Sequence, residues 1–165
     1  MFRPFLIKNS ITDLDAQWLK QQGIAALLLD VDNTLTSHDS QEVSPAIIGW
    51  LSEMQKAGVK LTVVSNGKYE RVKPFAEKLG LSFISLAAKP LPFGFFRAVK
   101  ALGLSKKQCA VVGDQLFTDL LGGKLAGIRV ILLHPIEPEI GKPFIQFKRR
   151  LEKPIVRRWT GTEDW

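Results

Sequence analysis

Five short runs of apolar residues recur along this 165-residue chain, separated by stretches with helical spacing. The runs cover residues 24–29, 59–64, 83–86, 109–112 and 128–133. Continuous apolar runs of this length are typical of strands that are buried on both faces. Their alternation with helical patterns predicts an α/β fold, with a five-stranded parallel sheet and helices on both of its faces.

The stretches between the runs have the features of helices. In "SPAIIGWLSEMQKAG", Ser44 can cap the amino end of a helix and Pro45 can occupy its first position. A second helix is expected to begin near Pro74, and an amino-terminal helix is expected around residues 12–21. The stretches "FRAVKALG" and "DLLGGKLAG" predict two more helices, although the paired glycines weaken the second prediction.

The length of the chain predicts one domain, which we place at residues 1–141, followed by a basic, aromatic-containing tail at residues 142–165. The single cysteine, Cys109, excludes an internal disulfide. The apolar runs are too short to span a membrane, and the first ten residues have too short an apolar segment for a secretory signal. We therefore expect a cytoplasmic protein.

Most of the net charge of +7 lies in the tail, because residues 142–158 carry seven basic residues and one acid. The basic residues are Lys142, Lys148, Arg149, Arg150, Lys153, Arg157 and Arg158. A basic segment of this kind indicates an anionic partner, such as lipid headgroups or nucleic acid. Nucleic acid is disfavoured because no stacking motif of an RNA-binding fold is present.

Phe144, Phe147, Leu151 and Ile155 recur in the tail at helical spacing and predict an amphipathic helix that Pro154 would interrupt. This apolar seam has three possible partners. It can pack on the protein's own sheet, lie in an anionic membrane interface at the inner face of a membrane, or contact another macromolecule.

Polar residues that can carry out chemistry follow four of the five predicted strands. They are Asp30 and Asp32 in "DVDNT", Ser65 and Asn66 in "SNG", Lys89 in "AKP", and Asp114 and Asp119 in "GDQLFTD". Because ligands of open α/β sheets bind beyond the carboxyl ends of the strands, we expect these side chains to share one site.

These residue types suit phosphoryl transfer. The carboxylates of Asp30, Asp32 and Asp114 are hard oxygen donors that can bind Mg²⁺. A carboxylate can also attack a phosphate monoester and form an aspartyl-phosphate. A metal ion and Lys89 would offset the negative charge, and Ser65 can donate to a phosphate oxygen. The pair in "DVDNT" then has separate roles: one aspartate attacks, and the other handles the proton of the leaving group.

The four segments "DVDNT", "VVSN", "AKP" and "GDQLFTD", in this order, resemble the motifs of the haloacid dehalogenase-like (HAD) phosphohydrolase superfamily. Nearly the full chain is similar to the narrower YqeG-type family of capless phosphatases, through "LLLDVDNTLT", "VSNGKYERVKPFAEKLG", "AAKP" and "VVGDQLFTDLLGGKLAG". The resemblance implies a Rossmann-like sheet with strand order 3-2-1-4-5.

The resemblance also implies a role for each motif residue. Asp30 would be the nucleophile and a Mg²⁺ ligand, and Asp32 the general acid and base, with its backbone carbonyl on the metal. Lys89 would steady the nucleophile and the phosphate, Asp114 would bind the metal, and Asp119 would support them. Thr34 would support the first loop and, with Ser65 and Asn66, bind the substrate phosphate.

Enzymes of this superfamily often carry a cap domain, but the spacing here leaves room for one helix and one strand between successive motifs. The resemblance therefore implies an open site, which suits bulky substrates. The similarity of the YqeG-type family to mitochondrial phosphatidylglycerophosphate phosphatases makes that lipid the leading candidate. The alternatives are a soluble phospho-metabolite, a phosphoprotein, or a non-catalytic nucleic-acid-binding or assembly module.

Overall fold

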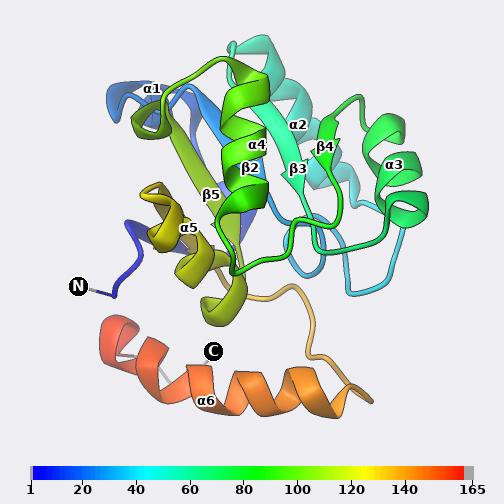
Figure 1. The fold of residues 1–165 in the computed structure, drawn as a ribbon, viewed down its shortest axis with the longest axis vertical. Coiled ribbons are helices and arrows are strands. Elements are labelled where there is room, and N and C mark those ends of the chain that lie inside the picture. The colour runs from blue at the N-terminus through cyan, green and yellow to red at the C-terminus, as the bar shows by residue number, and fades with distance from the viewer. Residues whose placement is uncertain (1, 162–165) are drawn as a thin grey trace.

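The computed structural model describes residues 2–161 and contains one parallel sheet of six strands (Figure 1). The order across the sheet is β1-β6-β5-β2-β3-β4. The strands are β1 (Leu6–Lys8), β2 (Ala26–Leu29), β3 (Lys60–Val64), β4 (Ser82–Ile84), β5 (Cys109–Gly113) and β6 (Arg129–Leu133).

The five expected strands are confirmed as β2 to β6, and their arrangement is the expected order 3-2-1-4-5. The expected number of strands is wrong, because β1 adds a sixth at the edge of the sheet, where Leu6 pairs with Ile131 of β6. Strand β1 has three residues and is only half-buried. Such a short edge strand lacks the long apolar run by which a central strand is recognised.

Helices cover both faces of the sheet, as expected. They are α1 (Ala16–Gln21), α2 (Pro45–Lys56), α3 (Tyr69–Lys78), α4 (Phe93–Leu102), α5 (Leu121–Ala126) and α6 (Pro143–Thr160). Alternate residues of β2 point to opposite faces. Leu27 and Leu29 pack in the cluster that α1, α2 and α3 share, and Ala26 and Leu28 pack in the cluster of α4, α5 and α6.

The helix boundaries agree with the sequence in one case and differ in others. Ser44 caps α2 by accepting a hydrogen bond from the Ile47 backbone, and Pro45 lies in its first turn. Helix α3 begins at Tyr69, so Pro74 lies inside it, and Pro154 lies inside α6 without ending it. Both prolines are exposed, where water can satisfy the carbonyl groups that lose their partners.

The amino-terminal helix is also shorter than expected. In place of one helix at residues 12–21, the structure has a 3₁₀ turn at Ile11–Asp13 and then the six-residue α1. The two segments have separate caps: Ser10 accepts a hydrogen bond from the Thr12 backbone, and Asp15 accepts one from Trp18.

The basic tail forms α6, which runs along the end of the molecule in Figure 1. The face of α6 that packs on the body carries Glu152 and Val156, both fully buried. Of the predicted apolar seam, Ile155 contacts the core, whereas Phe144, Phe147 and Leu151 are exposed. The division of the chain after residue 141 stays a prediction.

Two topological facts bear on the site. Within residues 2–161, α2 is the only helix between β2 and β3, and α3 is the only helix between β3 and β4, so neither connection holds a cap domain. Strand β2 lies between β3 and β5, and the ends of these three strands form one edge. Among the described residues, no helix has the length and apolar character needed to cross a bilayer.

Candidate active site

A buried lysine joins two carboxylates at the carboxyl edge of the sheet. Lys89 Nζ lies 2.6 Å from Asp30 Oδ1 and 2.7 Å from Asp119 Oδ1. Burial raises the pKa of Asp30 to about 7, an increase that Lys89 opposes and Asp119 reinforces. Burial disfavours the charge on Lys89, but Asp119 and Asp30 outweigh it and raise the Lys89 pKa above its ordinary value. The lysine therefore stays protonated beside the two acids.

Asp114, the next acid, follows β5 and is fully buried. Its Oδ2 accepts a hydrogen bond from Arg149 of α6, whose guanidinium also donates to the Asp114 backbone carbonyl at 2.8 Å. Within residues 2–161, Asp114 Oδ1 is buried and has no hydrogen-bond partner. Burial raises the pKa of Asp114 well above its ordinary value, Arg149 acts against the increase, and Asp30 and Asp119 add to it.

The donor set fits a divalent cation. Asp30, Asp114 and Asp119 each place one carboxylate oxygen within 4.8 Å of the others. Carboxylates are the ligands that hard cations such as Mg²⁺ prefer, and an ion there would satisfy the unpaired Asp114 Oδ1. A bound cation would also lower the pKa of the carboxyl groups that it contacts.

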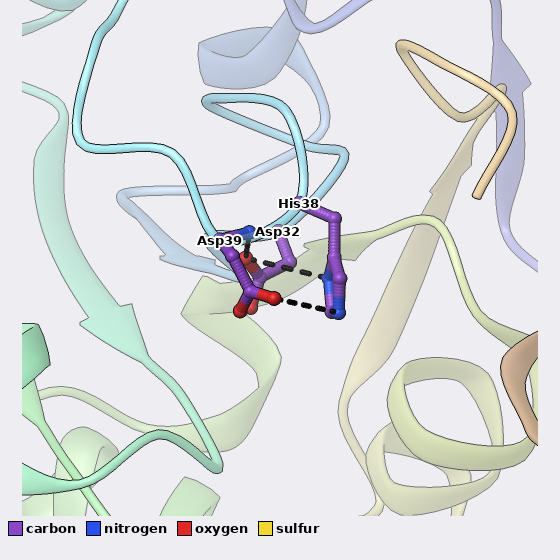
Figure 2. A group of neighbouring side chains, drawn as sticks. All are labelled: Asp32, His38 and Asp39. Carbon is purple, nitrogen blue, oxygen red and sulfur yellow. Dashed lines mark hydrogen bonds and ion pairs between the residues drawn. The ribbon is translucent and has the colours of Figure 1, made fainter. Parts of the chain in front are cut away.

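Asp32 lies beside His38 and Asp39 of the loop that follows it (Figure 2). Its oxygens accept hydrogen bonds from Arg71 at 2.6 and 3.1 Å and from the Asp39 backbone at 3.0 Å. His38 Nδ1 lies 3.5 Å from Asp32 Oδ1. Burial opposes the charge on Asp32, but the bonds from Arg71 and Asp39 outweigh it and lower its pKa. Asp32 is therefore a carboxylate in this conformation.

The second and third motifs meet through Asn66. Its Nδ2 donates to the Lys89 backbone carbonyl at 3.0 Å, and its Oδ1 accepts from the Lys89 backbone N–H at 2.7 Å. Asn66 thus positions the lysine. Ser65 Oγ accepts a hydrogen bond from the Gly67 backbone, and Thr34 Oγ1 is buried without a partner among the described residues.

Gly113 allows Asp119 to approach the end of β5. A Cβ atom at position 113 would collide with the carboxylate of Asp119. Residues 116–120 form a π-helical turn, so that Asp119 Oδ2 accepts a hydrogen bond from the Gln115 backbone at 3.2 Å. The spacing in "GDQLFTD" therefore brings both of its acids to the site.

Three residues outside the four motifs, Arg149, Glu139 and Glu152, complete the site, and the motifs do not predict them. Arg149 donates to Glu139 at 3.2 Å and to Glu152 at 3.1 Å as well as to Asp114. Asn33 of the first motif donates to Glu139 at 2.9 Å. These contacts join α6 and residues 134–140 to the first and fourth motifs. The sequence indicates Arg149 only as one of the basic residues of the tail.

A hollow of about 530 Å³ lies beside the site, between residues 134–140 and α6. Its lining includes the apolar side chains of Ile136 and Ile140 and the basic side chains of Arg150 and Lys153. Arg149 and Glu139 line it as well and connect it to Asp114.

The sequence of residues 7–127 matches the family model of the haloacid dehalogenase-like hydrolases, which therefore covers more than half of the chain. The chain belongs to the haloacid dehalogenase-like hydrolase family. It is 40% identical over 156 residues to the probable phosphatase YqeG of Bacillus subtilis, covering 94% of this chain and 90% of that one. The chain is thus a phosphatase of the HAD type.

Two further proteins are more distant. The chloroplastic/mitochondrial phosphatidylglycerophosphate phosphatase 1 of Arabidopsis thaliana is 28% identical over 172 residues, which cover 95% of this chain and 49% of that protein. The cobalt-bound deoxy-D-mannose-octulosonate 8-phosphate phosphatase of Haemophilus influenzae superposes with a TM-score of 0.56 at 16% identity. That superposition covers 78% of this chain and 77% of the other, and it supports the fold.

Proposed function

We propose that this phosphatase hydrolyses phosphomonoesters through an aspartyl-phosphate on Asp30, that its metal is Mg²⁺, and that its substrate is phosphatidylglycerophosphate. The observation that carries the reaction is the position of Asp30. This buried carboxylate accepts a hydrogen bond from Lys89 and lies among acids that suit a divalent cation. A carboxylate nucleophile beside a lysine and a cation site suits the formation of an aspartyl-phosphate.

The first step transfers the phosphoryl group to the protein. An Asp30 carboxylate oxygen attacks phosphorus, the bond from phosphorus to the ester oxygen breaks, and Asp32 gives its proton to that oxygen. The paired Asp32 carboxylate must leave Arg71 and take up a proton before it can act as the acid. Ser65, the backbone of Asn66, and Thr34 would hold the phosphoryl oxygens.

The second step returns the enzyme to its starting state. Asp32 takes a proton from water, the water oxygen attacks phosphorus, and the bond to Asp30 breaks to release inorganic phosphate. Lys89 would balance the carboxylate charge of Asp30 before the attack and again after phosphate is released. Bound by Asp30, Asp114 and the backbone carbonyl of Asp32, Mg²⁺ would supply positive charge to the phosphoryl oxygens, with Asp119 in support.

The lipid assignment has three supports. The name of the Arabidopsis relative gives that substrate for that protein. The connections after β2 and β3 hold no cap domain that would exclude a bulky molecule. The hollow next to Arg149 offers apolar and basic side chains to the part of the substrate that does not react. Such a substrate would place the enzyme in the cytoplasm, as a peripheral protein at the inner face of the membrane.

The test is release of inorganic phosphate from phosphatidylglycerophosphate in neutral detergent micelles with Mg²⁺. Glycerol 3-phosphate serves as the water-soluble comparison, and Asp30→Asn is the control variant. We expect turnover of the lipid that EDTA abolishes and that the variant lacks. Turnover of the soluble ester with none of the lipid would refute the substrate, and turnover by Asp30→Asn would refute the mechanism.

A further inference from the structure

Helix α6 exposes an apolar stripe that the body of the protein does not cover. The exposed fractions of Phe144, Phe147 and Leu151 are 69%, 58% and 47%. These residues lie at spacings of three and four along the helix, so they share one face. Ile140, which precedes the helix, is 85% exposed. We refer to the stripe of Phe144, Phe147 and Leu151 as the outer face of α6.

Positive charge surrounds this outer face. Arg150, Lys153, Arg157 and Arg158 are exposed on the same helix. The Lys148 ammonium lies 4.7 Å from the centre of the Phe144 ring. The single acid of Pro143–Thr160, Glu152, is fully buried, where it pairs with Arg149 and accepts hydrogen bonds from the backbone of Leu116 and Phe117. The solvent-facing side of α6 therefore presents cations and apolar groups without an acid.

We propose that the outer face of α6 docks on an anionic lipid surface. A helix with an apolar stripe bordered by cations can lie in the plane of a membrane interface, with its apolar side chains at the headgroup boundary. The basic residues would gain from the negative potential of the lipid. The choice of a lipid partner rests on the lipid substrate proposed above, because both require the protein to work at the same surface.

Charge disfavours the other occupants of this surface. If two copies of the chain paired through the outer face, the cations of one helix would face those of the other and repel them. Binding to nucleic acid would use the cations, but it would leave three exposed apolar side chains without a role. An anionic lipid surface complements both features.

One side of α6 contacts the site, and the other side forms the outer face. Arg149, on the side that packs on the body, contacts Asp114, and the outer face begins within the same two turns of helix. A docked α6 would therefore hold the edge of the active site close to the lipid headgroups. Docking requires no movement of the helix away from the body.

The test measures co-sedimentation with phosphatidylcholine vesicles that contain or lack phosphatidylglycerol. The Asp30→Asn protein serves as the parent, so that turnover plays no part. The test variant adds Phe144→Ser and Phe147→Ser. The matched control adds Ile48→Ser on α2 and Leu125→Ser on α5, two residues that are also exposed. Circular dichroism checks that each variant is folded, and Leu151→Ser replaces the double variant if that one does not fold.

We expect the parent and the control to bind the anionic vesicles, with salt weakening the binding, and neither to bind neutral vesicles. The Phe144 and Phe147 double variant should bind at least about tenfold more weakly, because two aromatic side chains no longer enter the interface. Equal binding by the double variant and the parent would overturn the proposal. Salt-dependent binding to single-stranded RNA with no binding to vesicles would overturn it too.

The vesicle-binding test of the docking surface and the micelle test of the proposed reaction can fail independently of each other. Vesicle binding by a protein that does not hydrolyse the lipid in micelles would overturn the substrate and leave the docking surface. Hydrolysis in micelles without binding to anionic vesicles would overturn the docking surface and leave the substrate.

Discussion

Lys89 holds two of the three buried carboxylates of the site, and its own position depends on the side chain of Asn66. The charges balance incompletely, because one lysine faces both Asp30 and Asp119 while Asp114 pairs with Arg149. A divalent cation would supply the positive charge that such a cluster needs in order to ionise fully.

The first prediction concerns this ionisation. Burial raises the pKa of Asp30 to about 7, so below that pH the metal-free protein holds a proton that an ordinary aspartate has already lost. A metal ion must displace this proton. The affinity for Mg²⁺ should therefore fall by at least about tenfold for each pH unit below about 7, since the raised pKa of Asp114 adds to the effect. Titration calorimetry across this range measures the slope, and an affinity independent of pH would contradict the raised pKa of Asp30.

The residues of the four motifs could be predicted from the sequence because each follows a recognisable strand. Asp30, Lys89, Asp114 and Asp119 come together as their positions beyond parallel strands require. The pairing of Asp32 with Arg71 could not be predicted, because the sequence predicts a helix that begins near Pro74, whereas α3 begins at Tyr69 and includes Arg71.

At the scale of elements, α6 contributes most of what the sequence did not reveal. The spacing of its apolar residues predicts an amphipathic helix correctly, but it does not say which side faces the body. Polar residues settle this point, because Glu152 and Arg149 face inward and are satisfied by partners from distant parts of the chain. The spacing of apolar residues alone does not reveal that charged residues of a helix are buried in ion pairs.

Arg149 offers a second prediction, on the stability of the protein. Its guanidinium pairs with Asp114, Glu139 and Glu152, all three of them buried. Replacing it with glutamine leaves these carboxylates without a cation, so the free energy of unfolding should fall by about 3–5 kcal/mol. Urea denaturation measures this loss.

The matched control is Arg150→Gln, which removes the same charge from the exposed neighbouring position. It should change the free energy of unfolding by less than about 0.5 kcal/mol. Equal losses in the two variants would show that the buried ion pairs of Arg149 do not stabilise α6 on the body.

At the scale of the whole molecule, the topology determines what can reach the site. Strand β2 lies between β3 and β5, so the residues after these strands meet at one edge, and single helices in the connections leave that edge without a cap. The alternation of apolar runs and helical stretches in the sequence predicts this arrangement. The edge strand β1 and the packing of α6 depend on long-range contacts with β6 and the fourth motif, which local patterns do not reveal.

The central claim is that Asp30 carries the phosphoryl group, and the most direct measurement is to locate that group. In an Asp32→Asn variant the first step lacks its acid and the second lacks its base, but a 4-nitrophenolate group leaves without a proton, so the aspartyl-phosphate should accumulate when 4-nitrophenyl phosphate and Mg²⁺ are added. Borohydride would reduce the acyl phosphate to homoserine, which mass spectrometry of the peptides can locate. We predict homoserine at position 30, dependent on substrate and absent with EDTA. A reduced residue elsewhere, or continued turnover with position 30 unmodified, would contradict the claim.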